Sequence, residues 1–242
     1  MGSKNRIAKY ILPIILKDRK EGQYYVEPFV GGCNMIDKVD GNRIGNDNNK
    51  YLIAMWQGLI SGINYPTHIP KDLYNVARDV YNGTELRFEH QMNMTDDMVG
   101  WIGWMGSYNG RFFDGGYSGH NVGITNRNYI SEQIKNTQSQ IQNLKGIQFF
   151  SLDYSELEIP CNSIIYSDIP YKNSKQYSTS KNFDHDKFWQ WCREKSLEGH
   201  SVFISEYEAP NDFECIWSKE IKNTLNQTKT YTPTEKLFRY NG

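Results

Sequence analysis

The feature that most constrains the fold is the stretch 164–171, IIYSDIPY. Its short apolar, β-branched run predicts a buried strand that ends at Asp168, with Pro170 and Tyr171 directly after it. Ligand sites of parallel sheets form beyond the carboxyl ends of the strands, so this carboxylate and ring are expected at such an edge. A strand that ends in an ordinary proline turn, with Asp168 as a cap, gives the same local pattern. Only the rest of the chain distinguishes this interpretation from a ligand site.

Strands and helices alternate at both ends of the sequence. The elements expected first are a helix over 5–16 that Pro13 kinks or splits, a strand at 24–26, a glycine turn at Gly31-Gly32, a strand at 43–45 ending near Asp47, and a helix over 49–60. A strand, a glycine turn, a second strand and an acid, in this order, are typical of the start of a nucleotide-binding α/β sheet.

The later elements show where an insertion lies. They are helices over 71–82, 95–108 and 127–144, strands at 147–152 and 164–167, a helix from 185, a strand at 202–205, and strands near 219–225 and 235–240. Asp184 is the expected N-cap of the helix from 185, with Phe183 and Phe188 as a hydrophobic staple. The long connection before Asp153 predicts an inserted subdomain over 55–135, between catalytic-domain segments 1–54 and 136–242.

Composition excludes several classes of protein. The net charge is −1, so no global basic field indicates nucleic acid, although a DNA-binding enzyme needs only one basic face. The four cysteines form no CxxC pair, and neither they nor the five histidines show metal-ligand spacing, which predicts free thiols and no metal. No signal peptide and no membrane-length apolar run is present, which predicts a soluble intracellular protein.

The glycine turn does not match two common nucleotide motifs. Cys33 stands where a GxGxxG fingerprint has its second glycine, so the pattern argues against a dinucleotide enzyme. No glycine-rich loop ends in Gly-Lys-Ser/Thr, which excludes a P-loop. Asp47 still follows the turn at about the distance at which an acid binds ribose hydroxyls.

Taken together, EPFVGG at 27–32, Asp47, and DIPY at 168–171, in this order around a large insertion, resemble the Dam-type DNA adenine-N6 methyltransferases. The likeness covers nearly the whole chain and includes Gly2-Ser3-Lys4, Tyr108-Asn109-Gly110 and Ile204-Ser205. The resemblance implies an α/β fold, with a Rossmann-like methyltransferase sheet and an inserted, mainly helical target-recognition subdomain. It also implies S-adenosyl-L-methionine as cofactor and adenine N6 of a flipped-out base in duplex DNA as the methyl acceptor.

The resemblance also assigns roles to individual residues. The catalytic residues would be Asp168, Ile169, Pro170 and Tyr171. The cofactor-binding residues would be Lys4, Glu27, Pro28, Phe29, Gly31, Gly32, Asp47, Asp153 and Asp168. The residues expected to contact DNA, from their place in the insertion or after the catalytic turn, are Tyr108, Asn109, Arg111, Arg127, Lys172, Lys175 and Lys181. We expect double-stranded DNA as the partner, a monomer or weak dimer, and the cytoplasm of a bacterial or phage-infected cell.

Two residues depart from the family pattern. Cys33 replaces a glycine, which the loop tolerates if φ at this position is negative. Ile169 replaces the first proline of Asp-Pro-Pro-Tyr but keeps the backbone carbonyl, and Pro170 still restrains residue 169 to extended conformations. The alternatives are a catalytically weak DNA-binding homologue, or a methyltransferase of the same fold that acts on RNA or a protein amide.

Overall fold

A computed structural model describes residues 4–84, 94–119, 127–172, 183–220 and 234–242. The chain forms two compact units. One joins residues 4–46 to residues 153–242, and the other holds residues 47–152. The two compact units divide at 46/47 and 152/153. The domain boundaries expected at 54/55 and 135/136 stay a prediction.

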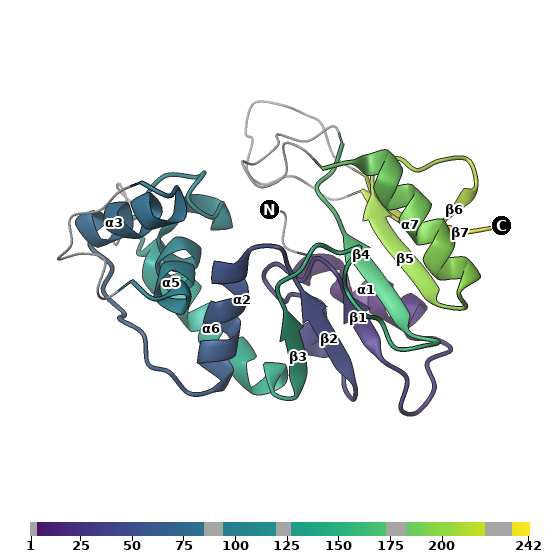
Figure 1. Ribbon diagram of the computed structural model, residues 1–242, viewed down its shortest axis with the longest axis horizontal. Coiled ribbons are helices and arrows are strands. Elements are labelled where there is room, and N and C mark those ends of the chain that lie inside the picture. The colour runs from purple at the N-terminus through teal and green to yellow at the C-terminus, as the bar shows by residue number, and fades with distance from the viewer. Residues whose placement is uncertain (1–3, 85–93, 120–126, 173–182, 221–233) are drawn as a thin grey trace. The chain divides into compact units, whose positions relative to one another are not determined.

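The unit of residues 4–46 and 153–242 is built on a mainly parallel sheet (Figure 1). Its strands are β1 (Tyr25–Glu27), β2 (Arg43–Asn46), β4 (Ile164–Asp168), β5 (Ser201–Glu206), β6 (Phe213–Glu220) and β7 (Thr234–Tyr240). They lie in the order β2-β1-β4-β5-β7-β6. Neighbours from β2 to β5 pair in parallel, and β7 is antiparallel to both β5 and β6. An α/β fold with a Rossmann-like sheet is thereby confirmed.

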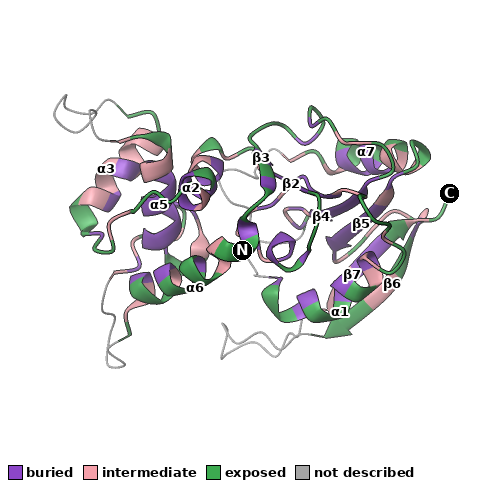
Figure 2. Ribbon diagram, turned by 90° about the horizontal axis from the view of Figure 1, so that it is seen from below, coloured by how far each residue is buried: buried purple, intermediate pink, exposed green. Residues whose placement is uncertain are grey.

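Helices cover both faces of this sheet. The views in Figures 1 and 2 place α1 (Asn5–Ile15) and α7 (His185–Leu197) on opposite faces, with buried strands β4 and β5 between them. Phe188 and Trp191 of α7 pack into a core with apolar residues of β4 and β5. Layers of this kind bury both faces of the central strands, which explains their continuous apolar runs.

The start of α7 matches the sequence prediction. The side chain of Asp184 accepts a hydrogen bond of 2.9 Å from the backbone N–H of Lys187, so it caps the helix. The rings of Phe183 and Phe188 lie 5.7 Å apart, as a hydrophobic staple requires. This cap fixes the direction in which the chain enters α7.

Two expectations about elements are met only in part. Of the kink or split expected at Pro13, the split does not occur, because α1 continues through Pro13 to Ile15. The strand expected at 219–225 is β6, which begins already at Phe213 and whose described part ends at Glu220. Most side chains of β6 are at least partly exposed, so its sequence lacks the apolar alternation that would have located it.

The unit of residues 47–152 is mainly helical. Its elements are α2 (Lys50–Ile60), α3 (Lys71–Tyr81), α5 (Asp96–Gly106), the 3-10 turn η2 (Tyr108–Gly110), α6 (Tyr129–Leu144) and strand β3 (Ile147–Phe150). Nearly all of α5 is buried, and a Cβ atom on Gly100 would lie 1.9 Å from the backbone oxygen of Tyr51 in α2. The absence of a side chain at Gly100 therefore lets the backbones of α2 and α5 approach closely.

Candidate active site

The turn 168–171 lies at the carboxyl end of β4, as its sequence predicts. Residues 164–167 are buried, and Asp168 is in register with Ser205 of β5. Ile169 and Tyr171 are also buried, whereas 29% of the Asp168 side chain is exposed. The strand thus presents one partly accessible carboxylate at the edge where parallel sheets bind ligands.

A buried lysine joins this turn from the other end of the unit. Lys4 is 7% exposed, and its Nζ atom lies 3.0 Å from Oδ1 of Asp168. The same Nζ donates a hydrogen bond of 2.7 Å to the hydroxyl oxygen of Tyr171 and lies 4.6 Å from the centre of that ring. Lys4, Asp168 and Tyr171, all singled out from the sequence, therefore meet in one cluster, while the cofactor role expected for Lys4 stays a prediction.

A further carboxylate completes the cluster. Oε2 of Glu235, at the start of β7, accepts a hydrogen bond of 2.8 Å from the Tyr171 hydroxyl and lies 3.3 Å from Nζ of Lys4. Sequence reasoning missed Glu235, because its partners are far away in the chain. The strand expected at 235–240 was the available signal, since an antiparallel strand that starts at the carboxyl edge carries its first side chains to the site.

The charges in the cluster shift one another's pKa. Burial alone would lower the pKa of Lys4, but the carboxylates of Asp168 and Glu235 more than reverse this, so its pKa is raised and it stays an ammonium ion. Burial raises the pKa of Asp168, and the nearby Lys4 opposes that effect. The ammonium is therefore the main group that keeps Asp168 available as a carboxylate.

Glu206 is a second acid that sequence reasoning missed. It ends β5, and its carboxylate accepts hydrogen bonds from the backbone N–H groups of Lys172, at 3.2 Å, and Tyr207, at 2.7 Å. Burial raises the pKa of Glu206 to about 7, against the opposing effect of these donors. The residue ties the chain just after Tyr171 to the end of β5, and the rule that acids follow strands would have found it.

The glycine turn follows β1. Glu27 is buried and accepts a hydrogen bond of 2.9 Å from the Tyr25 hydroxyl. Burial raises its pKa well above the usual value, although that hydrogen bond opposes the shift. The side-chain amide of Asn46 donates to the carbonyl of Pro28 at 3.0 Å, which ties the turn to the end of β2. Gly31 has a φ of +46°, a conformation that favours glycine.

The condition under which the loop was expected to tolerate Cys33, a negative φ, is not met. The φ of Cys33 is +55°, and its side chain is fully buried. The N–H of Cys33 bonds the Val30 carbonyl at 2.8 Å, and its own carbonyl accepts from the N–H of Asp37 at 3.3 Å. The tight turn into η1 (Ile36–Lys38) therefore holds Cys33 in the left-handed region.

Aromatic rings surround Phe29 of the glycine turn. Its ring lies 5.2 Å from that of Tyr154 and 5.7 Å from that of Phe183. The buried hydroxyl of Tyr154 has no hydrogen-bond partner among the described residues. The neighbouring Asp153 is exposed and accepts a hydrogen bond of 2.9 Å from the N–H of Ser155.

The other residues expected at the site belong to the unit of residues 47–152. Asp47 accepts a hydrogen bond of 3.0 Å from the N–H of Asn49 in the turn before α2. Tyr108 and Asn109 are exposed in η2, and Asn109 has a φ of +57°. Arg127 is exposed, and its Nη2 lies 2.7 Å from Oε2 of Glu132.

The remaining residues singled out from the sequence lie partly inside and partly outside the described ranges. Lys172 is exposed directly after the turn 168–171. Lys175, Lys181 and Gly2-Ser3 lie outside the described residues. Arg111 is half-buried after η2. All four cysteines are free thiols, as predicted.

Within the described ranges, no group of three or more His, Cys, Asp or Glu side chains is arranged to hold a metal ion. Within the same ranges, the helices are too short or too polar to cross a lipid bilayer.

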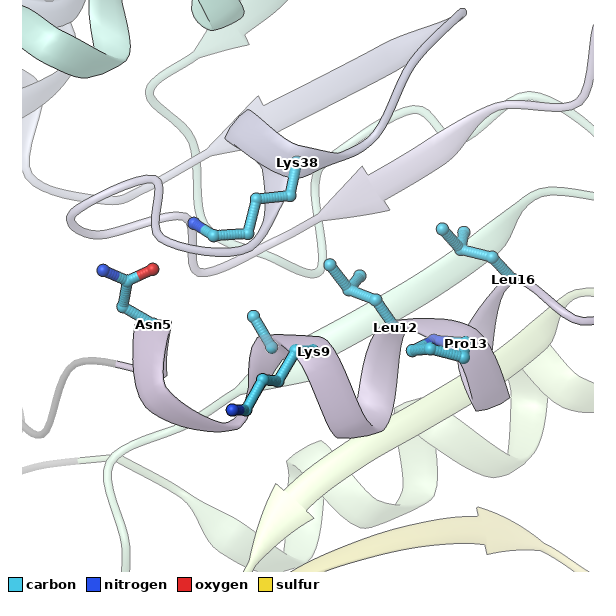
Figure 3. A pocket seen from close by; sticks show the side chains of 7 residues that line it. Asn5, Lys9, Leu12, Pro13, Leu16 and Lys38 are labelled. Carbon is cyan, nitrogen blue, oxygen red and sulfur yellow. The ribbon is translucent and has the colours of Figure 1, made fainter.

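A groove on the surface is lined by residues of α1 and η1 and of the chain between them. It runs along α1 toward Lys38 of η1, and Figure 3 shows Leu12, Pro13 and Leu16 on one side of it. Its lining contains none of the residues expected to act on a substrate. The residues suited to chemistry are therefore those of the cluster of Lys4, Asp168, Tyr171 and Glu235, and the groove contains none of them.

In comparisons with known proteins, the first part of the chain matches one family model. Residues 1–97 match the family model of the D12 class N6 adenine-specific DNA methyltransferase, and no curated protein matches the chain. The chain is similar to the crystal structure of SMU.472, a methyltransferase complexed with SAH, with 11% sequence identity and a TM-score of 0.36. That match covers 100% of this chain and 53% of the other protein, so this chain spans about half the length of the other protein. The matched residues 1–97 include Lys4 and the glycine turn, and the family of this model is the one that the sequence motifs resemble.

Proposed function

We propose that this chain transfers the methyl group of S-adenosyl-L-methionine to adenine N6 in duplex DNA, at a specific sequence. The observation that carries the proposal is the turn 168–171, which places the partly exposed carboxylate of Asp168, followed by Ile169, at the end of β4. It belongs to a chain whose first part matches an adenine-N6 methyltransferase family. A turn of this kind suits an amine that must be held by two acceptors.

The chemistry of the acceptor explains the residue types. The exocyclic amine of adenine is a poor nucleophile, because its lone pair is delocalised into the ring. Hydrogen bonds from its two N–H groups to the Asp168 carboxylate and the Ile169 carbonyl would favour a pyramidal nitrogen with a localised lone pair. Catalysis would then rest on positioning and electrostatics, without a covalent intermediate.

Duplex DNA hides this amine, so the target base has to be flipped out. Tyr171 directly follows the two acceptors and would stack on the flipped base. A base–aromatic stack contributes about 1–3 kcal/mol, which offsets part of the cost of unstacking. The exposed Lys172 is placed after this ring and would contact a phosphate group.

The residues near Phe29 fit the proposed cofactor, which supplies an electrophilic methyl group when bound. The unpartnered hydroxyl of Tyr154 and the exposed carboxylate of Asp153 offer a donor and an acceptor beside an aromatic wall, as the edge of a purine ring requires. The glycine turn from Glu27 to Gly32 would hold the methionine part. Asp47 would bind the ribose hydroxyls.

We assign DNA recognition to the inserted segment 55–135. Tyr108, Asn109, Arg111 and Arg127 are its candidates for contact with base edges and phosphates. We also infer that the protein acts as a monomer or weak dimer in the cytoplasm of a bacterial or phage-infected cell, where its DNA substrate is present. Restriction–modification is one role that such an enzyme serves.

Methyl-labelled cofactor and duplex DNA test the proposal. Wild-type protein is expected to label DNA, and Asp168→Ala to abolish the label, while Asp186→Ala, which removes an exposed acid in α7, keeps it. Unlabelled DNA with the wild type would overturn the proposed activity, and undiminished label with Asp168→Ala would overturn the mechanism. Sequencing of treated genomic DNA then identifies the modified base and its context.

The same assay separates the alternatives. A methyltransferase with another substrate would label RNA or a protein amide instead of DNA. A catalytically weak homologue would bind DNA and transfer little label, and its rate would rise in Ile169→Pro, which restores the proline that this turn lacks relative to its family.

A further inference from the structure

The position of Glu235 follows from the register of the sheet. Strand β7 runs antiparallel to β5 and pairs Lys236 with Glu206 and Leu237 with Ser205. Ser205 in turn pairs with Asp168 of β4. Glu235, just before Lys236, is therefore carried to the carboxyl ends of β4 and β5, although β7 itself points the other way.

The Tyr171 hydroxyl is held on both sides. It donates to Oε2 of Glu235 at 2.8 Å and accepts from Nζ of Lys4 at 2.7 Å. Nζ of Lys4 lies 3.3 Å from the same Oε2, which closes a triangle of polar atoms. The Tyr171 ring also packs against the ring of Tyr207, at a centroid distance of 4.4 Å and an angle of 77°. The Glu235 side chain is only 15% exposed, so water competes weakly for these bonds.

We propose that Glu235 is a positioning residue for methyl transfer, which holds the Tyr171 ring through its hydroxyl and the Asp168 carboxylate through Lys4. The inference rests on the proposed function, in which Tyr171 stacks on the target base and Asp168 accepts its N–H. Reactions that depend on positioning are sensitive to small displacements, and an error of about 1 Å can cost roughly 100-fold in rate.

The charge of Glu235 gives the proposal a signature in the pH profile. The titratable groups that face it, directly or through the cluster, are Lys4, Tyr166, Asp168, Tyr171 and Glu206. The negative charge of Glu235 raises the pKa of Asp168. In E235Q this charge is gone and Lys4 pairs with Asp168 alone, so the pKa of Asp168 should fall. The acidic limb of the pH profile of kcat should therefore move to lower pH.

Four proteins test the proposal: E235Q, Y171F, the double variant, and E214Q as a matched control with an exposed acid on the neighbouring strand β6. We expect E235Q to lower kcat about tenfold or more, the usual effect of losing a hydrogen bond to a charged group. The KM for the cofactor should stay unchanged. If Glu235 acts on the ring through the hydroxyl, the double variant should be little slower than Y171F, and urea unfolding should show coupling between the two substitutions.

The outcomes distinguish the two proposals. If the wild type is active and E235Q is as fast as E214Q with the same pH profile, the role of Glu235 is overturned and the proposed function stands. If E235Q only lowers the free energy of unfolding and the folded protein keeps its kcat, the residue is structural and the inference is also overturned. If the wild type transfers no methyl group to DNA, the proposed function is overturned, and any coupling between Glu235 and Tyr171 then serves the fold alone.

Discussion

Nζ of Lys4 lies 3.0 Å from Oδ1 of Asp168, so the turn 168–171 is contacted by a residue that precedes the first helix. The same ammonium faces the carboxylate of Glu235. Its removal would leave two acids facing each other with no compensating charge.

Lys4→Met tests this pairing. A buried charge left without its partner typically costs about 3 kcal/mol or more in the free energy of unfolding. We therefore expect a loss of stability in urea unfolding and a strong loss of methyl transfer in the folded protein. Lys9→Met removes an exposed lysine from α1, the helix that follows Lys4, and should change stability by less than about 0.5 kcal/mol. Equal behaviour of the two variants would contradict a compensating role for Lys4.

Glu206 predicts how stability depends on pH. Its folded pKa of about 7 lies above the ordinary value of 4.5, so the folded protein binds the proton more tightly than the unfolded chain does. Its contribution to stability is present below about pH 4.5 and is lost as the pH rises through 7, by up to about 3 kcal/mol.

Urea unfolding between pH 4.5 and 8 measures this effect. Glu206→Gln should lose part of the decline seen in the wild type, because its side chain does not titrate. Glu208→Gln, which changes a nearby exposed acid, should follow the wild type. A Glu206→Gln profile parallel to the wild type would show that Glu206 does not cause the decline.

The left-handed conformation of Cys33 predicts a difference between two small residues. Cys33→Ala and Cys33→Gly both remove the buried thiol, but only alanine keeps the strain of a Cβ atom at a φ of +55°. We expect Cys33→Gly to be the more stable variant by about 1 kcal/mol in urea unfolding. A more stable Cys33→Ala would mean that the turn relaxes to negative φ.

Gly100 predicts a packing defect in the unit of residues 47–152. In Gly100→Ala the new Cβ atom would meet the backbone oxygen of Tyr51 at 1.9 Å, which forces α2 and α5 apart. Overpacking of this kind costs about 1–3 kcal/mol, measurable as a lower Tm. Gln138→Ala, on the exposed face of α6, should leave Tm nearly unchanged. A wild-type Tm in Gly100→Ala would show that these helices are free to separate.

Local chemistry explains what the sequence predicts well. The strand before Asp168 was predictable because its apolar run is buried on both faces, and the start of α7 because Asp184 and Phe183 form a cap that depends only on near neighbours. The same reasoning failed for β6, whose side chains contact little of the core and therefore show no period.

Contacts between distant parts of the chain were not predictable. Glu235 carries a recognisable charge, but only the strand order brings it to Lys4 and Tyr171. Cys33 shows a second limit: its φ follows from backbone hydrogen bonds of the turn, and a small side chain at this position is compatible with either sign.

The place of β7 between β5 and β6 also has a consequence for biosynthesis. The ribosome makes Lys4 first and Asp168 long before Glu235, so a nascent chain contains the turn 168–171 and Lys4 before the last strand exists. Until β7 inserts, Lys4 has no Glu235 and the Tyr171 hydroxyl lacks its acceptor. The completed polar triangle is therefore a late product of translation, and a ribosome-bound chain that stops before residue 234 should not yet methylate DNA.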